Sequence, residues 1–385
     1  MLFDQPWQIL DVGSVWMKEF ASALCNVVPA VCWEPRISAL GVLRRRQQSE
    51  YLSNPPLLVE RFPMQAGYAR QPLASLLHYE NRTVAMMKWR CARPYDTPLI
   101  CSTPFYAPIA EIWPGPVAYY STDLTYAYDG VDSQQVKELD RRMCRVATAV
   151  LPNSRRIANY FVEQAGCDPA KIAVIPNATR QSNISSTPLL SPGPLPEDIS
   201  SLPRPIAGVM GILAENMDWP LLCEAIRLTP DVHWVFVGPT SRPMRDRAQS
   251  EAREAAQRIA TFVGAKSYGE LQQYARAFDV AVLPYKKKEP TYSGSSTRFY
   301  EHLAACRPMI STKGFAELVE KAPLVTLIDT AEQLQESIQS LALRQFRDGL
   351  ETKRWLASQR ATWEERARTM VEVVLSGVDH REAVV

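Results

Sequence analysis

The stretch 279–312 combines residue types that could together hold a charged ligand. It opens with a short apolar run typical of a buried parallel strand, and the four small residues 293–296 precede a predicted helix that begins at about Thr297. A helix N-terminus presents backbone N–H groups that lack intrahelical partners, and the helix dipole favours an anion there. Arg298 and the lysines 286–288 add positive charge. This stretch therefore predicts a site for a phosphate-bearing ligand.

An acid follows this turn at a spacing that suits a nucleoside. Glu301 lies three residues after Arg298, which places both on one face of the predicted helix. A carboxylate repels phosphate but can accept two hydrogen bonds from a ribose diol. The combination predicts a site for a nucleoside diphosphate. The alternative is an ordinary strand–helix–strand unit with a capped helix and a solvated lysine loop.

The same block resembles the C-terminal signature of the group 1 (family 4-like) glycosyltransferases, which have the GT-B fold and use nucleotide-sugar donors. The resemblance implies that Glu301 is the second glutamate of the family's E-x7-E motif and binds the ribose, while the small-residue turn holds the diphosphate. The first glutamate would stand at position 293, which is a serine here. Some polysaccharide-assembling members, such as the xanthan glucuronosyltransferase type, also lack it and keep a similar turn.

The resemblance covers most of the chain from about Val117 onward, including LPNSRRIANYFVEQAGCDPAKIAVIPNAT and GVMGILAENMDWPLL. Gly211 ends a predicted strand, where phosphates can approach the backbone closely; in the family an arginine and a lysine often follow, but Ile212 and Met217 stand here. The loop 263–266 and Tyr268 correspond to the family's nucleobase border. For both segments the alternative is an ordinary turn. The candidate donor-binding residues are Gly211, Ile212, Gly264, Tyr268, Lys286, Ser293, Gly294, Ser295, Ser296, Thr297, Arg298 and Glu301.

The N-terminal half offers one candidate catalytic acid, Asp123, just beyond the predicted strand 117–121. Open α/β sheets bind ligands at the carboxyl ends of their strands, so this aspartate could take a proton from an acceptor hydroxyl. The family's polysaccharide-assembling type has an aspartate at a similar Ser-Asp position. The alternative is that Asp123 caps the following segment. Gly13 and Ser14, at the end of the first predicted strand, are candidates for facing the donor or acceptor.

Apolar strands alternate with amphipathic helices along the whole chain, which predicts parallel, doubly wound sheets. A stretch rich in Ser and Pro interrupts the series and predicts a linker. The predicted fold class is α/β, with the GT-B arrangement implied by the resemblance: two Rossmann-like domains facing each other across a cleft. The predicted divisions are an acceptor domain over 1–180, the linker over 181–205, a donor domain over 206–350, and a helix over 351–385 that crosses back to the first domain.

Composition narrows the remaining possibilities. The 43 basic and 41 acidic residues nearly cancel, giving a formal net charge of +2, which argues against a nucleic-acid binder. The eight cysteines form no C-x-x-C pair and there are only four histidines, so we expect neither a disulfide framework nor a metal cofactor. No apolar run reaches the roughly 18 residues of a membrane span, and no secretory signal pattern is present. We expect a cytoplasmic protein.

Basic residues in the N-terminal half could still touch anionic lipid at the inner face of the membrane. They are Arg44, Arg45, Arg46, Lys88, Arg90 and Arg93. A solvated basic loop is the alternative.

The expected activity is transfer of a sugar from a nucleoside-diphosphate sugar, UDP-linked for preference, to a glycan or lipid-linked acceptor in bacterial surface or exopolysaccharide synthesis, without a metal. A nucleotide-sugar epimerase of GT-B architecture and a catalytically inactive GT-B partner subunit are the alternatives. Group 1 membership implies retention of configuration, whereas Asp123 as a base implies inversion, and both stay open at this point.

Overall fold

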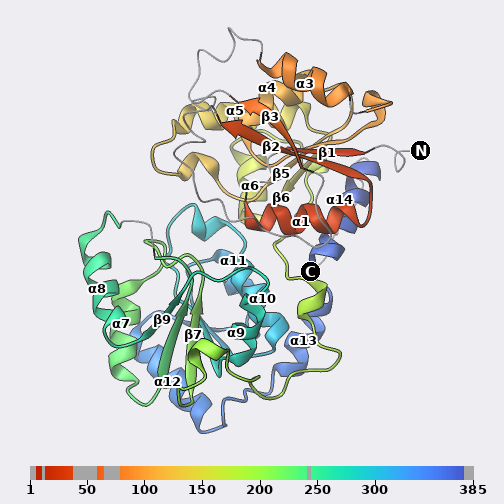
Figure 1. Ribbon diagram of the computed structural model, residues 1–385. Helices are drawn as coiled ribbons and strands as arrows, with labels where there is room; N and C mark the ends of the chain where they lie inside the picture. Colours follow the sequence, from red (N-terminus) through yellow and green to blue (C-terminus); the bar gives the residue numbers. More distant parts are fainter. Residues whose placement is uncertain are drawn as a thin grey trace. The chain divides into compact units, whose positions relative to one another are not determined.

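The computed structural model describes most of the chain, namely residues 6–10, 14–37, 59–64, 79–89, 91–240 and 244–376. Gly13, Arg90 and the arginine triplet 44–46 lie outside these residues. The chain divides into two compact units (Figure 1). Unit 1 is formed by two separate stretches, one that ends at Pro176 and one that begins at Trp363, whereas unit 2 is the continuous stretch 177–362.

Unit 1 contains a sheet whose described strands are all parallel, in the order β3-β2-β1-β4-β5-β6. The strands are β1 Trp7–Leu10, β2 Ala30–Ile37, β3 Val59–Met64, β4 Leu99–Cys101, β5 Val117–Ser121 and β6 Ala149–Pro152. The helices of this unit are α1 Val15–Cys25, α3 Tyr79–Trp89, α4 Ala107–Ile112, α5 Ser133–Val146, α6 Arg155–Glu163 and α14 Trp363–Ser376.

Unit 2 repeats the same strand order, β12-β11-β10-β7-β8-β9, again with parallel neighbours. The strands are β7 Ile206–Met210, β8 His233–Val237, β9 Thr261–Gly264, β10 Val280–Leu283, β11 Met309–Thr312 and β12 Thr326–Ile328. The helices are α7 Trp219–Leu228, α8 Arg247–Gln257, α9 Leu271–Ala277, α10 Thr297–Ala305, α11 Ala316–Glu320, α12 Ala331–Ala342 and α13 Glu351–Gln359. Each unit is thus a Rossmann-like doubly wound sheet, as predicted, and its strand order reverses at one switch point, between β1 and β4 or between β7 and β10.

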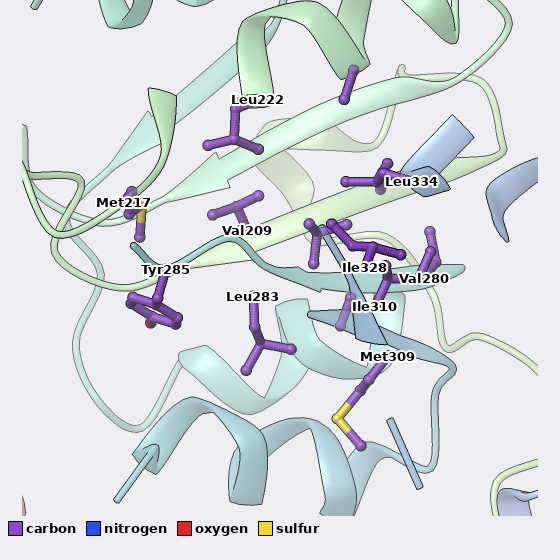
Figure 2. Close-up of a cluster of buried hydrophobic side chains, with 14 of the residues drawn as sticks. Val209, Met217, Leu222, Val280, Leu283, Tyr285, Met309, Ile310, Ile328 and Leu334 are labelled. Carbon is purple, nitrogen blue, oxygen red and sulfur yellow. The ribbon is translucent and has the colours of Figure 1, made fainter. Parts of the chain in front are cut away.

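The core of unit 2 forms because helices cover both faces of its sheet. Figure 1 shows α7, α8 and α12 to one side of the strands and α9, α10 and α13 to the other. The central strands β7 and β10 are buried along their full length. Figure 2 shows side chains from both strands, among them Val209 and Leu283, within one cluster with Ile310 and Leu334. Burial on both faces explains why these strands read as continuous apolar runs instead of alternating ones.

After the short η7 helix (Pro169–Lys171), an extended segment shares one isolated bridge with β6, between Ile172 and Val150. The expectation for the stretch that follows is wrong. The stretch 181–205, expected to be a linker, is packed into unit 2. Its short helix η8 (Gln181–Asn183) contacts α10, Ile199 is fully buried, and Arg204 pairs with Asp279 at 2.8 Å. Side-chain contacts of this kind leave no trace in a Ser/Pro-rich composition.

The C-terminal stretch, predicted as one helix over 351–385, contains two helices within the described residues. α13 ends at Gln359 and belongs to unit 2, whereas α14 begins at Trp363 and belongs to unit 1. The break coincides with a bridge between Thr179 and Thr362, at the two points where the chain passes between units. Within unit 1, α14 packs on α1, and the ring of Trp363 meets that of Phe20 edge-on at 6.4 Å. No helix in the described ranges is long and apolar enough to cross a membrane.

Candidate functional site

Three neighbouring strands of the unit 2 sheet have a glycine at their carboxyl ends. Gly211, Gly238 and Gly264 lie at the ends of β7, β8 and β9 with φ of 138°, 146° and 75°, a region that L side chains rarely adopt. A Cβ on Gly238 would stand 1.7 Å from the carbonyl oxygen of Gly211, so only glycine fits at position 238. This edge is the switch-point side of the sheet, and the missing side chains allow a ligand to approach the backbone closely.

Side chains from three segments of unit 2 come close to Gly211: the loop after β7, the loop after β10, and α10. A Cβ placed there would lie 3.4 Å from the Tyr285 hydroxyl oxygen, 3.5 Å from the Met217 Cε and 4.0 Å from the Arg298 Nε. Gly211 and Arg298, both predicted site residues, are therefore brought together. Ile212, also predicted, is 47% exposed. Tyr285 was not among the predicted residues, although its place at the end of β10 beside the switch point could have indicated it.

The turn before α10 provides only part of the predicted set of backbone donors. Ser296 is the N-cap of α10, and its Oγ accepts from the N–H of Phe299 at 3.3 Å. The N–H of Ser296 itself donates to the buried carboxylate of Glu317 at 2.9 Å, and the hydroxyl of Tyr300 donates to the other carboxylate oxygen. Burial raises the pKa of Glu317, against these hydrogen bonds. One N–H group predicted to face an anion is thus already used.

Other donors at the same turn remain available. Among the residues that the structure describes, the backbone N–H groups of Ser295, Thr297 and Arg298 donate to no acceptor. The Nη1 atom of Arg298 is buried and likewise has no hydrogen-bond partner there. Buried polar groups are rarely left unpaired, so this cluster of donors matches an anionic ligand.

Asn177, which sequence reasoning missed, fixes the shape of this turn. Its backbone N–H donates to the Oγ of Ser295 at 3.1 Å, and its Nδ2 donates to the Ser295 carbonyl at 2.8 Å and to the Thr297 Oγ1 at 2.9 Å. Asn177 is the first residue of unit 2, directly after Pro176. The only signal in the sequence is an asparagine after a proline, which is common in ordinary turns.

Glu301, the predicted ribose ligand, is fully buried and hydrogen-bonded on both oxygens. The Tyr268 hydroxyl donates to Oε1 at 2.5 Å, and the Asn183 Nδ2 donates to Oε2 at 3.1 Å. The guanidinium groups of Arg180 and Arg298 lie 4.8 and 6.0 Å from the centre of the Tyr268 ring. Tyr268 and Glu301 are thus neighbours, as a shared nucleoside site requires. Arg180 and Asn183 were missed because they fall at the predicted domain end and linker.

The remaining predicted donor residues lie around this cluster. Ser293 is buried, and its N–H and Oγ donate to the Glu289 carboxylate at 3.1 and 2.7 Å, while the Gly294 N–H donates to the carbonyl of Thr291. The Lys286 N–H donates to the carbonyl of Asn216, which joins the lysine loop to the segment after β7. The Gly264 carbonyl accepts from Gly238 at 2.8 Å.

In unit 1, Asp123 follows β5 as predicted, and its carboxylate accepts hydrogen bonds from Tyr128 and Thr122. Burial nonetheless raises its pKa to about 6. Asp123 does not cap the next segment, because η6 (Thr125–Ala127) begins after Leu124 without a side-chain cap. Ser14, predicted to face a ligand, caps α1 by accepting from the Met17 N–H at 3.3 Å.

Several titratable and aromatic side chains lie outside the cluster around Gly211 and Glu301. No set of three or more His, Cys, Asp or Glu side chains in the described part could hold a metal ion. His302 is buried against Phe278, and burial lowers its pKa to about 3, so it is neutral. Trp89 and Tyr95 are 79% and 74% exposed near the predicted basic residues of unit 1, where membrane contact stays a prediction.

The chain contains two Rossmann-like parallel sheets, and solved structures with the same arrangement of elements are known. Crystal structures of Anabaena HepE with UDP and glucose, of a glycosyltransferase from Rickettsia africae, and of the α,α-trehalose 6-phosphate synthase from Burkholderia multivorans are similar over the chain. Identities are 17%, 14% and 13%, and TM-scores are 0.70, 0.69 and 0.61. The matches cover 97%, 97% and 96% of this chain and 100%, 99% and 98% of the others. The chain has the GT-B fold.

The family comparison concerns unit 2. Residues 204–343 match the model of the family described as glycosyl transferases group 1, so the chain contains a domain of this type. The match includes the glycine edge, the turn before α10 and Glu301. No curated protein sequence gave a significant match.

Proposed function

We propose that the protein is a glycosyltransferase that takes a sugar from a nucleoside-diphosphate sugar, preferably a UDP-sugar. The observation that carries the proposal is a set of donors at the start of α10 that have no partner among the described residues, namely the buried Nη1 of Arg298 and the N–H groups of Ser295 and Thr297. The Nε of the same arginine lies 4.0 Å from the point where a Cβ on Gly211 would stand. HepE, which has the same fold, has been crystallised with UDP-glucose as well as with UDP.

In the proposed reaction the donor's diphosphate is the leaving group. Negative charge builds on it as the bond to the sugar breaks, so donors already fixed around it lower the barrier. Arg298 supplies a full positive charge, and the start of α10 supplies backbone N–H groups and the helix dipole. Glu301 accepts from the ribose hydroxyls. These groups carry the proposed stabilisation without a metal.

The acceptor is proposed to be a glycan or a lipid-linked glycan used in bacterial surface or exopolysaccharide synthesis, as in the polysaccharide-assembling transferases that the sequence resembles. Asp123 would take the proton of the acceptor hydroxyl. With a pKa of about 6, its carboxylate is mainly ionised at neutral pH, as a base must be. Direct attack assisted by such a base inverts the anomeric configuration, so the anomer formed reports on this role.

The direct test is calorimetry with UDP on the wild-type protein and on Arg298→Ala. We expect the wild type to bind and the variant to bind at least tenfold more weakly, because a charge-assisted hydrogen bond contributes about 1.5–3 kcal/mol. Arg258→Ala, at the exposed C-terminal end of α8, is the matched control.

Incubation with UDP-sugars then separates the possible activities. Slow hydrolysis of the donor supports a transferase, isomerisation of the sugar would indicate an epimerase, and absence of nucleotide binding would indicate a partner subunit.

A further inference from the structure

Tyr285 is held rigidly at the switch point of the unit 2 sheet. It follows Pro284 at the end of β10, its side chain is only 7% exposed, and its ring meets that of Phe315 edge-on at 4.9 Å. Its carbonyl accepts from the Thr312 Oγ1 at 2.5 Å, and its backbone pairs with Met217. The buried ring and the hydrogen-bonded backbone therefore hold the Tyr285 hydroxyl in one position.

The Tyr285 hydroxyl lies close to Gly211 and to Arg298. It lies 3.4 Å from the point where a Cβ on Gly211 would stand, and the Arg298 Nε lies 4.0 Å from that same point. Among the described residues, the hydroxyl donates no hydrogen bond. Burial raises the pKa of Tyr285, and the charge of Arg298 opposes this only in part, so the phenol stays protonated at neutral pH and remains a donor.

The described segment directly after β7, residues 211–218, contains no basic side chain. The segment after β7 presents Ile212 and Met217, which are apolar, and its acids are engaged elsewhere. The Glu215 carboxylate accepts from the Arg245 N–H, and the Asp218 carboxylate caps α7 by accepting from the Leu221 N–H. Beside Gly211 itself, the nearby donor groups are the Tyr285 hydroxyl, just after β10, and the Arg298 Nε of α10.

We propose that the Tyr285 hydroxyl donates a hydrogen bond to an anionic oxygen of the bound diphosphate, next to Arg298. This inference rests on the proposed function and adds a residue to its site. The bond adds no charge to the site, but it strengthens as negative charge develops on the leaving group, because hydrogen bonds to charged acceptors are stronger than neutral ones. Tyr285 thus contributes both to nucleotide affinity and to the rate of transfer.

Tyr285→Phe tests this proposal, because it removes the hydroxyl and keeps the ring. We expect the Kd for UDP to rise about tenfold, the lower range for a hydrogen bond to a charged group, while the Kd for uridine stays unchanged. The Tm is expected to match the wild type, since the hydroxyl bonds to nothing in the described protein. Tyr95→Phe, which removes an exposed hydroxyl in unit 1, is the matched control.

An unchanged Kd for UDP, an equal loss for uridine, or a fall in Tm of several degrees would each overturn the role of Tyr285. If the wild type binds no UDP, the proposed function fails instead, and titration with inorganic pyrophosphate then decides the inference. Weaker pyrophosphate binding by Tyr285→Phe would still support an anion site at this hydroxyl, whereas equal binding or none would overturn it.

Discussion

Glu301 is a buried acid whose orientation is set by hydrogen bonds to both of its carboxylate oxygens. Each carboxylate oxygen has two lone-pair directions, and the structure uses one on Oε1 for Tyr268 and one on Oε2 for Asn183. The two donors hold the side chain in one orientation. A preorganised acceptor of this kind loses little freedom when a diol binds.

Glu301→Gln is expected to weaken binding of UDP about tenfold, because the amide is uncharged and replaces one acceptor oxygen with an NH₂ donor. The nucleotide 2′,3′-dideoxy-UDP, which lacks the diol, should lose much less. Calorimetry with both nucleotides measures the difference, with Glu224→Gln on the surface of α7 as the control. Equal losses for the two nucleotides would show that Glu301 does not bind the ribose.

At the scale of elements, a second buried acid joins a strand to two helices in unit 1. Asp140 of α5 accepts from Tyr119 of β5 and from Tyr160 of α6, both at 2.8 Å. Burial raises its pKa to about 6 in spite of these bonds. Folding therefore favours the protonated carboxyl, whose pKa in an unfolded chain is about 4.

Because its pKa is raised on folding, Asp140 stabilises the folded protein at low pH and loses this effect as the pH rises. The contribution of Asp140 is complete below about pH 4 and is lost as the pH rises through about 6. We expect the free energy of unfolding of the wild type, relative to that of Asp140→Asn, to fall by about 2 kcal/mol between pH 4 and pH 7. Urea denaturation at several pH values measures this, and parallel profiles for the two proteins would contradict it.

Over the whole molecule, the chain distributes the proposed chemistry between two units of the same topology. The anion site and Glu301 belong to unit 2, whereas Asp123 lies at the end of β5 in unit 1. Binding of the nucleotide and removal of the acceptor proton should therefore respond to different substitutions.

Asp123→Asn is expected to leave the Kd for UDP within about twofold of the wild type and to lower the rate of transfer at least a hundredfold, the usual effect of losing a general base. In the wild type, the rate should fall as the pH drops below about 6, where the carboxylate becomes protonated. A transfer assay with the acceptor, run from pH 5 to 8 beside calorimetry, checks both expectations. Unchanged transfer by the variant would remove Asp123 from the mechanism.

How much the sequence predicted depended on the range of the interactions involved. β5 has the predicted bounds, 117–121, because an apolar run between turn residues is a local signal. The break between α13 and α14 was missed because no Gly or Pro marks it; a bridge to the distant Thr179 coincides with it.

In the candidate site, too, residues with a local signal could be predicted and residues with long-range contacts could not. Gly211, Arg298 and Glu301 could be proposed because each stands at a recognisable place on a strand or helix. Asn177 and Asn183 could not, since their roles come from hydrogen bonds to residues more than a hundred positions away. The use of the Ser296 N–H by Glu317 was also missed, because it is a tertiary contact between side chain and backbone 21 residues apart.

The discontinuity of unit 1 has a consequence for the order in which the protein matures. A ribosome releases residues 177–362 before α14, so the second unit can be complete while the first still lacks the helix that covers Phe20 on α1. During that interval the nascent chain exposes an apolar surface, and a product that terminates early, after residue 362, would keep it exposed permanently. Loss of a short C-terminal piece would therefore harm the N-terminal unit, far away in sequence, more than the unit that precedes the cut.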